Sequence, residues 1–447
     1  MTTALAIDAA RPDLDTQLEE TRRSLFNHVA SGGRLAVVKA PPGSGKTWLL
    51  LETVAHAVSG GARAAIAAQT NAQADDICRR IARDHPAVQC ARLASEGHAR
   101  PSAFPTTVRW ETKTARLPLD PSVVVATTAK WGLAQLAAAY DVVFVDEAWQ
   151  LGWADFMLLG QVSARFVLIG DPGQIAPVVA VDVSRWQTAP LPPHHAAPAV
   201  ILRSRGQDAL GLSLPGTRRL PWDTTGLIQN FYDFSFGSWS GPGDRHVRPR
   251  KGTAHRLDST LDCLADGTVV AATLPTPDEG PPLERDDEVA VLAAEAVVRL
   301  LERKSVALVD GDEAQLQPED IGLCATHRVM NTAMQFALPK DLQGRVRVDT
   351  PERWQGLERK VMVVVHPLSG VVRPSAFDLE TGRLCVMASR HQAGLVLVSR
   401  DHVGDTLDEY LPSAQQAVGQ PDLEGRGHAQ NLEFWKALSE SKRIARV

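Results

Sequence analysis

The stretch LAVVKAPPGSGKTWLL, residues 35–50, decides the fold of the first half of the chain. A short apolar run of strand character is followed by a loop rich in Gly and Pro, and then by a helical segment. Glycines in such a loop let backbone N–H groups turn toward a phosphate, and the helix start adds the positive end of its dipole. The stretch therefore predicts a phosphate-binding loop, in which the nucleotide-binding residues are Gly43, Ser44, Gly45, Lys46 and Thr47.

Two of these residues have side chains suited to MgATP. Lys46 supplies a positive charge for the β- and γ-phosphates, and Thr47 offers a hydroxyl to Mg²⁺. The strict pattern begins with Gly where this chain has Ala40, which is a mild departure. The alternative, a Gly-rich turn between a strand and a helix, does not explain Lys and Thr side by side.

The segment VVFVDEAWQ, residues 142–150, ends a second apolar run in two adjacent carboxylates. Asp146 is placed to hold Mg²⁺, and Glu147 to polarise the water that attacks ATP. Neighbouring carboxylates at a strand end repel each other unless a cation or a water network stabilises them. An acidic surface turn is the alternative, and the phosphate loop upstream argues against it.

A third apolar run, FVLIGDPGQIAP at residues 166–177, leads into a stiff Gly/Pro turn that carries Gln174. In phosphate-loop NTPases a glutamine commonly orients the hydrolytic water or senses the γ-phosphate. We expect the sheet to place Gln174 beside that phosphate. Pro172 and Gly173 would fix its backbone, so that it reports the state of the nucleotide.

Short, almost wholly apolar runs alternate with helical segments along both halves of the chain, which predicts parallel sheets covered by helices on both faces. The 447-residue length predicts two or three domains. We expect an N-terminal helix over 1–33, a first α/β domain over 34–222, a linker or insertion over 223–285, and a second α/β domain with a C-terminal helix over 286–447.

Composition narrows the class of protein. The formal net charge of -5 gives no global attraction to nucleic acid, so a polyanion would have to be held by a local groove. The five cysteines show no metal-ligand spacing, which is typical of a reduced, cytoplasmic protein. We expect no signal peptide and no membrane span. The segment 240–256 carries five Lys or Arg, and is either a solvated loop or a phosphate-contacting insertion.

Nine segments in order along residues 34–400 resemble the motifs of superfamily 1 helicases, most closely the branch of the nonsense-mediated-decay RNA helicase. They are APPGSGKT (40–47), AAQTNAQADDI (67–77), VVATT (124–128), VDEAWQ (145–150), GDPGQIAP (170–177), TRRLPWDTTGLIQNFY (217–232), DIGLCATHRVMNTAM (320–334), TPERWQGLE (350–358) and CVMASRHQAGLVLVS (385–399). Only the first is specific by itself. Their order along the chain makes the set specific.

The resemblance implies two RecA-like domains with ATP and Mg²⁺ in the cleft between them. It implies that Arg219 and Arg390 reach the γ-phosphate from the second domain and complete charge neutralisation in the transition state. Each has an alternative, since Arg219 could be a surface or hinge arginine and Arg390 a salt-bridge partner. The remaining nucleotide-binding residues that the resemblance implies are Gln17, Gln355, Gly356 and Glu358.

Three positions depart from the family pattern. Arg218 stands where the family has an adenine-stacking Tyr, which puts base selectivity in doubt. Gln392 replaces a second basic residue, and Glu352 replaces an Asp. None of these changes removes a group that hydrolysis requires.

The resemblance also implies a single strand of DNA or RNA held by its phosphates. Hydroxyl, amide and basic groups suit this task because they position phosphates without reading sequence. A structural hydrogen-bonding role is the alternative for each residue. The implied contacts are Thr70, Asn71, Thr127, Thr128, His327, Arg328 and Thr350.

Two functions stay open at this stage. The first is an ATP hydrolase that moves along a single strand as a translocase or helicase. The second is a helicase-derived regulatory ATPase that acts as a nucleotide-gated scaffold for a protein partner. Little chain length remains for accessory domains. We therefore expect translocation rather than processive unwinding of a duplex. We expect a monomer.

Overall fold

The computed structural model describes residues 13–179, 181–186, 189–281, 283–412 and 422–447. The chain divides into two compact units, each described here by itself. Unit 1 contains the chain up to Pro172 together with Ala176–Gly216, and unit 2 contains Gly173–Ile175 together with Thr217–Val447. None of the described helices is long and apolar enough to cross a membrane.

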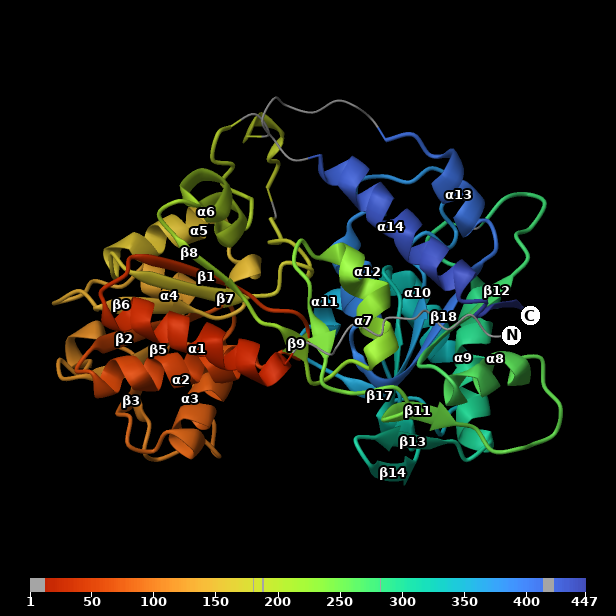
Figure 1. Ribbon diagram of the computed structural model, residues 1–447, viewed down its shortest axis with the longest axis horizontal. Coiled ribbons are helices and arrows are strands. Elements are labelled where there is room, and N and C mark those ends of the chain that lie inside the picture. Colours follow the sequence, from red (N-terminus) through yellow and green to blue (C-terminus); the bar gives the residue numbers. More distant parts are fainter. Residues whose placement is uncertain (1–12, 180, 187–188, 282, 413–421) are drawn as a thin grey trace. The chain divides into compact units, whose positions relative to one another are not determined.

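Unit 1 is built on an eight-stranded sheet with the order β4-β3-β5-β2-β6-β7-β1-β8 (Figure 1). Every pairing in it is parallel. The strands are β1 (Leu35–Lys39), β2 (Arg63–Ala68), β3 (Cys90–Leu93), β4 (Arg109–Glu111), β5 (Ser122–Thr127), β6 (Val142–Val145), β7 (Phe166–Gly170) and β8 (Leu210–Ser213).

Helices cover both faces of this sheet. Side chains alternate across it, so that Val38 points into one core and Val37 into the other. The first core is closed by α1 (Leu14–Ala30), α2 (Lys46–Ser59) and α3 (Asn71–Asp84). The second is closed by α4 (Thr128–Gly132), α5 (Trp153–Leu158) and α6 (Ala197–Arg205).

Unit 2 contains a six-stranded parallel sheet with the order β16-β15-β17-β18-β12-β19. The strands are β12 (Val269–Leu274), β15 (Ile321–Cys324), β16 (Arg347–Asp349), β17 (Arg359–Val365), β18 (His391–Arg400) and β19 (Ile444–Arg446). Its two cores are closed by α9 (Asp287–Glu302) and α10 (Arg328–Ala337) on one face, and by α7 (Trp222–Ile228), α12 (Thr381–Ala388), α13 (Val403–Glu409) and α14 (Leu423–Glu440) on the other.

Smaller elements complete unit 2. An antiparallel sheet is formed by β11 (Arg245–Arg248), β13 (Val306–Val309) and β14 (Asp312–Gln315). The short helices are α8 (Asp258–Asp262) and α11 (Pro351–Trp354), and β10 (Gly237–Ser238) pairs with β9 (Gly216–Thr217).

The α/β class with two parallel sheets, expected from the alternation of apolar runs, is confirmed. One strand of the six-stranded sheet lies where the sequence suggested a linker or insertion. β12 falls within 223–285, yet it lies between β18 and β19 and is buried along its whole length. The run VVAATL is apolar enough for a strand covered on both faces. Because it follows a basic, Gly/Pro-rich stretch, the sequence did not indicate that it belongs to a sheet.

Two histidines are buried in unit 2 in the neutral state. Burial is the largest cause that lowers the pKa of His366 to about 3 and that of His391 to about 4. A hydrogen bond of 2.9 Å joins His391 Nε2 and the Thr224 hydroxyl. Because both groups bind a proton in the unfolded chain near pH 6.5 but not in the folded unit, folding stability is lost as pH falls below about 6.5.

We expect His391→Gln to reduce this acid sensitivity, since an amide can still bond Thr224 and does not titrate. Between pH 7.5 and pH 5 the wild type should lose about 2 kcal/mol more unfolding free energy than the variant. Urea unfolding at the two pH values measures the difference. An equal loss in both proteins would show that His391 does not contribute.

Candidate nucleotide-binding site

The phosphate loop lies between β1 and α2 of unit 1. Gly43 and Gly45 adopt positive φ angles of 68° and 84°, in the left-handed region that suits glycine. Gly45 is the N-cap of α2, and no side chain caps the helix or places a negative charge in its first turn. The Ser44 hydroxyl is buried and has no hydrogen-bond partner among the described residues. The loop therefore presents backbone N–H groups and a spare hydroxyl to an anion.

The two predicted carboxylates lie beside this loop. β6 ends next to it, because only β7 separates β6 from β1 in the sheet. Lys46 Nζ contacts Glu147 Oε1 at 2.8 Å, and Thr47 Oγ1 lies 3.4 Å from Asp146 Oδ2. Thus the four groups that the sequence predicts for MgATP come together within one unit.

Burial makes the charge on Asp146 costly. Its side chain is 6% exposed, and its pKa is raised to about 6, chiefly by desolvation and then by repulsion from Glu147. Lys46 acts in the opposite direction and favours the ionised form. Glu147 itself has a left-handed backbone with φ of 50°, a conformation that non-glycine residues seldom adopt outside functional sites.

These residues fit a nucleotide with a magnesium ion. Lys46 contacts Glu147 and can turn to a triphosphate. No group of three or more His, Cys, Asp or Glu among the described residues could hold a metal alone. Mg²⁺ at Thr47 and Asp146 would therefore take its other ligands from phosphate oxygens and water, as this ion commonly does.

In unit 2, the predicted residues Arg219 and Glu358 contact each other, and Gln392 also bonds to Glu358. Arg219 forms an ion pair with its carboxylate, and Gln392 Nε2 donates to Glu358 Oε1 at 2.8 Å. Gln355 ends α11, and Gly356 follows with φ of 77°. Arg219 is thus not a free surface arginine, although its predicted contact with the γ-phosphate stays a prediction.

The other predicted arginine, Arg390, is 1% exposed. Its Nε donates to the carbonyl of Val386, one turn back at the end of α12, at 3.2 Å. This bond orients the guanidinium from within unit 2. Its role at the γ-phosphate also stays a prediction.

Sequence reasoning missed the group that holds the Arg218–Arg219 backbone. Arg245 of β11 is buried, forms an ion pair with Asp310 and donates to the carbonyl oxygens of both Arg218 and Arg219. The guanidinium of Arg218 lies 4.2 Å from the ring centre of Trp239. The alternating run RHVR indicates a strand at β11, but its basic residues and Gly/Pro-rich flanks are also typical of a loop.

Gln174 lies apart from the strand that precedes it. β7 ends at Gly170, and the residues Gly173–Ile175 group with unit 2. A side chain at Gly382 of α12 would meet the Gln174 carbonyl at 2.7 Å, so that helix packs directly on the Gln174 backbone. We expected the sheet to carry Gln174 beside the phosphate. The apolar Ile175, 4% exposed, packs in the core of unit 2, and the position of Gln174 beside the phosphate stays a prediction.

The predicted nucleic-acid residues of unit 1 follow adjacent strands. Ala68 of β2 pairs with Thr127 of β5, so the segments after both strands leave the same edge of the sheet. Thr70 caps α3 by accepting from Gln73 N, and Thr127 caps α4 by accepting from Lys130 N. The Asn71 side-chain oxygen accepts a hydrogen bond from the buried Arg92, and the Thr128 hydroxyl donates to the Ala68 carbonyl. These hydroxyls and amides thus have structural partners, and their contacts with nucleic acid stay a prediction.

In unit 2, His327 and Arg328 begin α10 and Thr350 begins α11. Arg328 is exposed, whereas Thr350 is 9% exposed. Gln17, predicted for the nucleotide base, is exposed in the first turn of α1. Its assignment stays a prediction.

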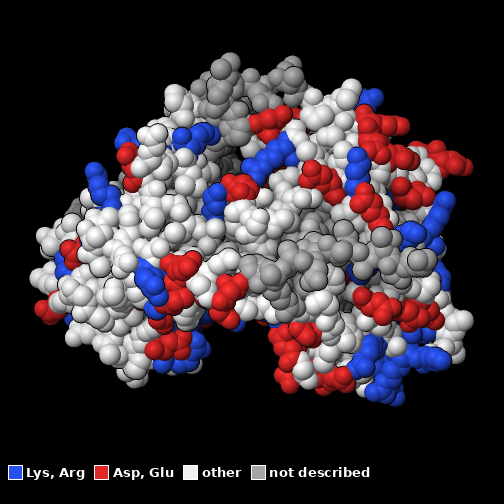
Figure 2. All heavy atoms as spheres, in the orientation of Figure 1, with Lys and Arg blue, Asp and Glu red and all other residues white. Residues whose placement is uncertain are grey.

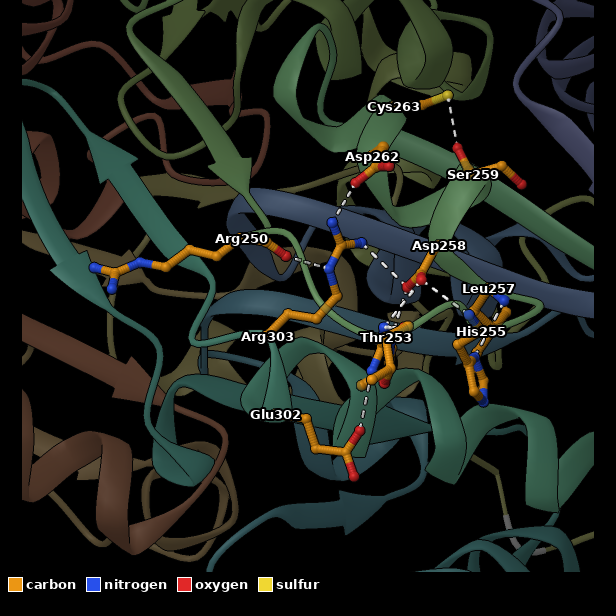
Figure 3. A network of polar contacts seen from close by, with 11 residues as sticks. Arg250, Thr253, His255, Leu257, Asp258, Ser259, Asp262, Cys263, Glu302 and Arg303 are labelled. Atoms are coloured by element: carbon orange, nitrogen blue, oxygen red, sulfur yellow. Dashed lines mark hydrogen bonds and ion pairs between the residues drawn. The ribbon is translucent and has the colours of Figure 1, made fainter.

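The basic segment 240–256 is fixed by ion pairs within unit 2. Besides Arg245, Arg248 pairs with Glu313 and Arg256 with Glu295. The backbone is held as well, because Arg303 Nε donates to the Arg250 carbonyl at 2.6 Å (Figure 3). On the face that Figure 2 shows, basic and acidic side chains of unit 2 lie next to each other rather than in a field of one sign. Three of the five basic side chains in this segment are therefore ion-paired within unit 2.

Arg303 and its neighbour on α9 also anchor α8. Arg303 pairs with Asp262 at 2.6 Å and with Asp258 at 3.3 Å, and Arg299 pairs with Asp258 at 2.8 Å. Figure 3 shows Asp258 at the centre of this network, facing the 250–257 backbone. The pairs tie the segment to α9.

Comparison with known proteins agrees with the site in unit 1. Residues 17–195 match the family model described as AAA domain. No curated protein matches the sequence. The match and the loop geometry together identify this part of the chain as a P-loop NTPase domain.

Solved structures with a similar chain path include viral helicases. Arterivirus nonstructural protein 10 (helicase) with DNA has a TM-score of 0.42 and 16% identity over 84% of this chain and 63% of that one. The same protein in another crystal structure has a TM-score of 0.44, with 16% identity over 84% and 62%. PRRSV helicase has a TM-score of 0.42 and 14% identity over 86% and 55%. The chain thus spans less than two thirds of each of these structures.

We expect Asp146→Asn to stabilise the ligand-free protein at pH 8, because the amide removes a buried charge. A pKa raised from 3.8 to about 6 means that ionised Asp146 lowers the unfolding free energy by about 2 to 3 kcal/mol above pH 6. The variant should regain this free energy at pH 8, and the gain should vanish as pH approaches 4. Thermal unfolding at pH 8 and pH 4.5 measures it. Asp141→Asn, at an exposed carboxylate just before the same strand, should give no such gain; an equal shift in both variants would contradict the assignment.

Proposed function

We propose that this chain is an ATP hydrolase that uses ATP to move along single-stranded DNA or RNA. The observation that carries the hydrolase part is the meeting of Lys46 with Glu147 and of Thr47 with Asp146 at the phosphate loop. Lys46 would bind the phosphates, Thr47 and Asp146 would hold Mg²⁺, and Glu147 would activate water. Mg²⁺ supplies charge neutralisation on the phosphates when bound.

The coupling of hydrolysis to motion is assigned to unit 2. In this proposal Arg219 and Arg390 stabilise the charge that develops on the γ-phosphate, and Gln174 senses it. Support comes from the arrangement within unit 2, where Arg219 is held by Glu358 and Gln174 lies against α12. A nucleotide-dependent change at either group would therefore act on unit 2 directly.

The nucleic-acid part is supported by the order of the nine motifs and by the polar groups at one edge of the unit 1 sheet. A second candidate, the regulatory ATPase that acts as a scaffold, is favoured by one observation. Three of the five basic side chains of 240–256 are paired with carboxylates of unit 2 and are not free to hold phosphates.

ATP hydrolysis measured alone and with single-stranded DNA, single-stranded RNA or duplex separates the two functions. We expect stimulation by a single strand, and loss of at least about 100-fold in rate in Glu147→Gln with ATP binding retained, because the variant lacks the group that polarises water. A rate that no nucleic acid changes would favour the scaffold. Full hydrolysis by Glu147→Gln would refute the role of Glu147.

Arg219→Ala should lower the rate of ATP hydrolysis by about 1000-fold, the usual range for an arginine that stabilises phosphoryl transfer. Arg248→Ala is the matched control, since Arg248 is also an ion-paired arginine of unit 2 but lies on β11 with Glu313. Steady-state rates at saturating ATP measure both. If the two variants were equally active, Arg219 would be a structural arginine only.

A further inference from the structure

Unit 2 exposes an aromatic ring beside a guanidinium and an imidazole. The side chain of Phe377 is 46% exposed. The guanidinium of Arg383 lies 4.0 Å from its ring centre, and the imidazole of His327 lies 5.7 Å away at a tilt of 38°. A cation over one face polarises and fixes a ring, while its remaining surface stays in solvent.

The ring is held on a rigid support. Arg383 bonds to Glu352 at 3.1 Å and to Glu380 at 3.0 Å, so its guanidinium cannot swing away freely. The loop that carries Phe377 is closed by Ser375, whose amide and hydroxyl both donate to Asp378 at 2.9 and 2.7 Å. An exposed aromatic residue on such a fixed loop loses little conformational entropy when a ligand packs on it.

The topology brings these residues to one edge of the sheet. His327 follows β15, Glu352 follows β16, and the Phe377 loop follows β17. β15 pairs in parallel with both β16 and β17, so all three segments leave the same carboxyl-terminal edge. This is where ligands commonly bind in open parallel sheets.

The charges around the ring favour a polyanion. Arg328 is exposed beside His327, Arg373 is exposed on the Phe377 loop, and Arg353 is exposed beside Glu352. Glu352 and Glu380 pair with Arg383, Asp378 accepts from Ser375, and Arg353 pairs with Asp349 at 3.6 Å, so Arg328 and Arg373 are the basic groups offered here to a polyanion. An accessible π surface next to exposed basic side chains is the combination that binds single-stranded nucleic acid by stacking and charge.

We propose that Phe377, with His327, forms a platform on which one base of a single-stranded nucleic acid stacks. This inference rests on the proposed function and adds a base contact to the phosphate contacts assigned there. Because every base has a π face, the platform accepts any sequence, and it serves DNA and RNA alike. Phe377 was not among the residues that the sequence predicted.

The test compares binding of strands with and without bases. A fluorescein-labelled 15-mer of thymidine, the corresponding 15-mer of uridine and a 15-mer of abasic sugar phosphates are titrated at 50 mM salt, and anisotropy is followed. We expect Phe377→Ala to weaken binding of both base-bearing strands about 10-fold, with little change for the abasic strand. Phe377→Trp should restore binding and report stacking by quenched tryptophan fluorescence.

Phe336→Ala is the matched control, since Phe336 is also an exposed phenylalanine of unit 2 and should leave all three affinities unchanged. Circular dichroism confirms that each variant folds. If the wild type binds the base-bearing strands and Phe377→Ala binds them equally well, the platform is refuted and the proposed function survives. If Phe377→Ala weakens the abasic strand equally, the residue acts on phosphates or on the fold, and the platform is again refuted. If the wild type binds no strand, both proposals fail, and the surface would belong to a protein partner.

Discussion

The contact between Lys46 and Glu147, beside the buried Asp146, is the constraint on which unit 1 depends. Two carboxylates at the end of β6 are unfavourable in a low-dielectric environment, and the raised pKa of Asp146 records that cost. The sheet order sets the position of these groups, because β6 and β1 are separated by a single strand. Lys46 offsets part of this cost, and a magnesium ion bound with a triphosphate would offset more of it.

Much of unit 1 could be predicted from the sequence. Its strands are short apolar runs bounded by polar turns, and the chemistry of Lys46, Thr47, Asp146 and Glu147 follows from residue type and spacing. β12 was harder to predict, because a buried parallel strand has no alternation and its flanks resembled a loop. Local patterns identify a strand type, but they do not say which segment of the chain completes a sheet.

Outside the motifs, side-chain partners from distant segments could not be predicted. Nothing near Arg245 in the sequence indicates that it would hold the carbonyl oxygens of Arg218 and Arg219. Likewise, Thr70 and Thr127 matched nucleic-acid motifs, yet their hydroxyls also cap helices. A capping hydroxyl still has a second lone pair. The structural and functional roles of these threonines are therefore compatible, and only binding measurements separate them.

The grouping of Gly173–Ile175 with unit 2 has a consequence for dissecting the molecule. The chain passes between the units three times, after Pro172, after Ile175 and after Gly216. No single cut releases either unit intact. A fragment that ends at Gly216 would carry Ile175 away from the core that buries it, and the complementary fragment would lack one of its own core residues. The two units are separate in their cores but interlaced in their covalent connectivity.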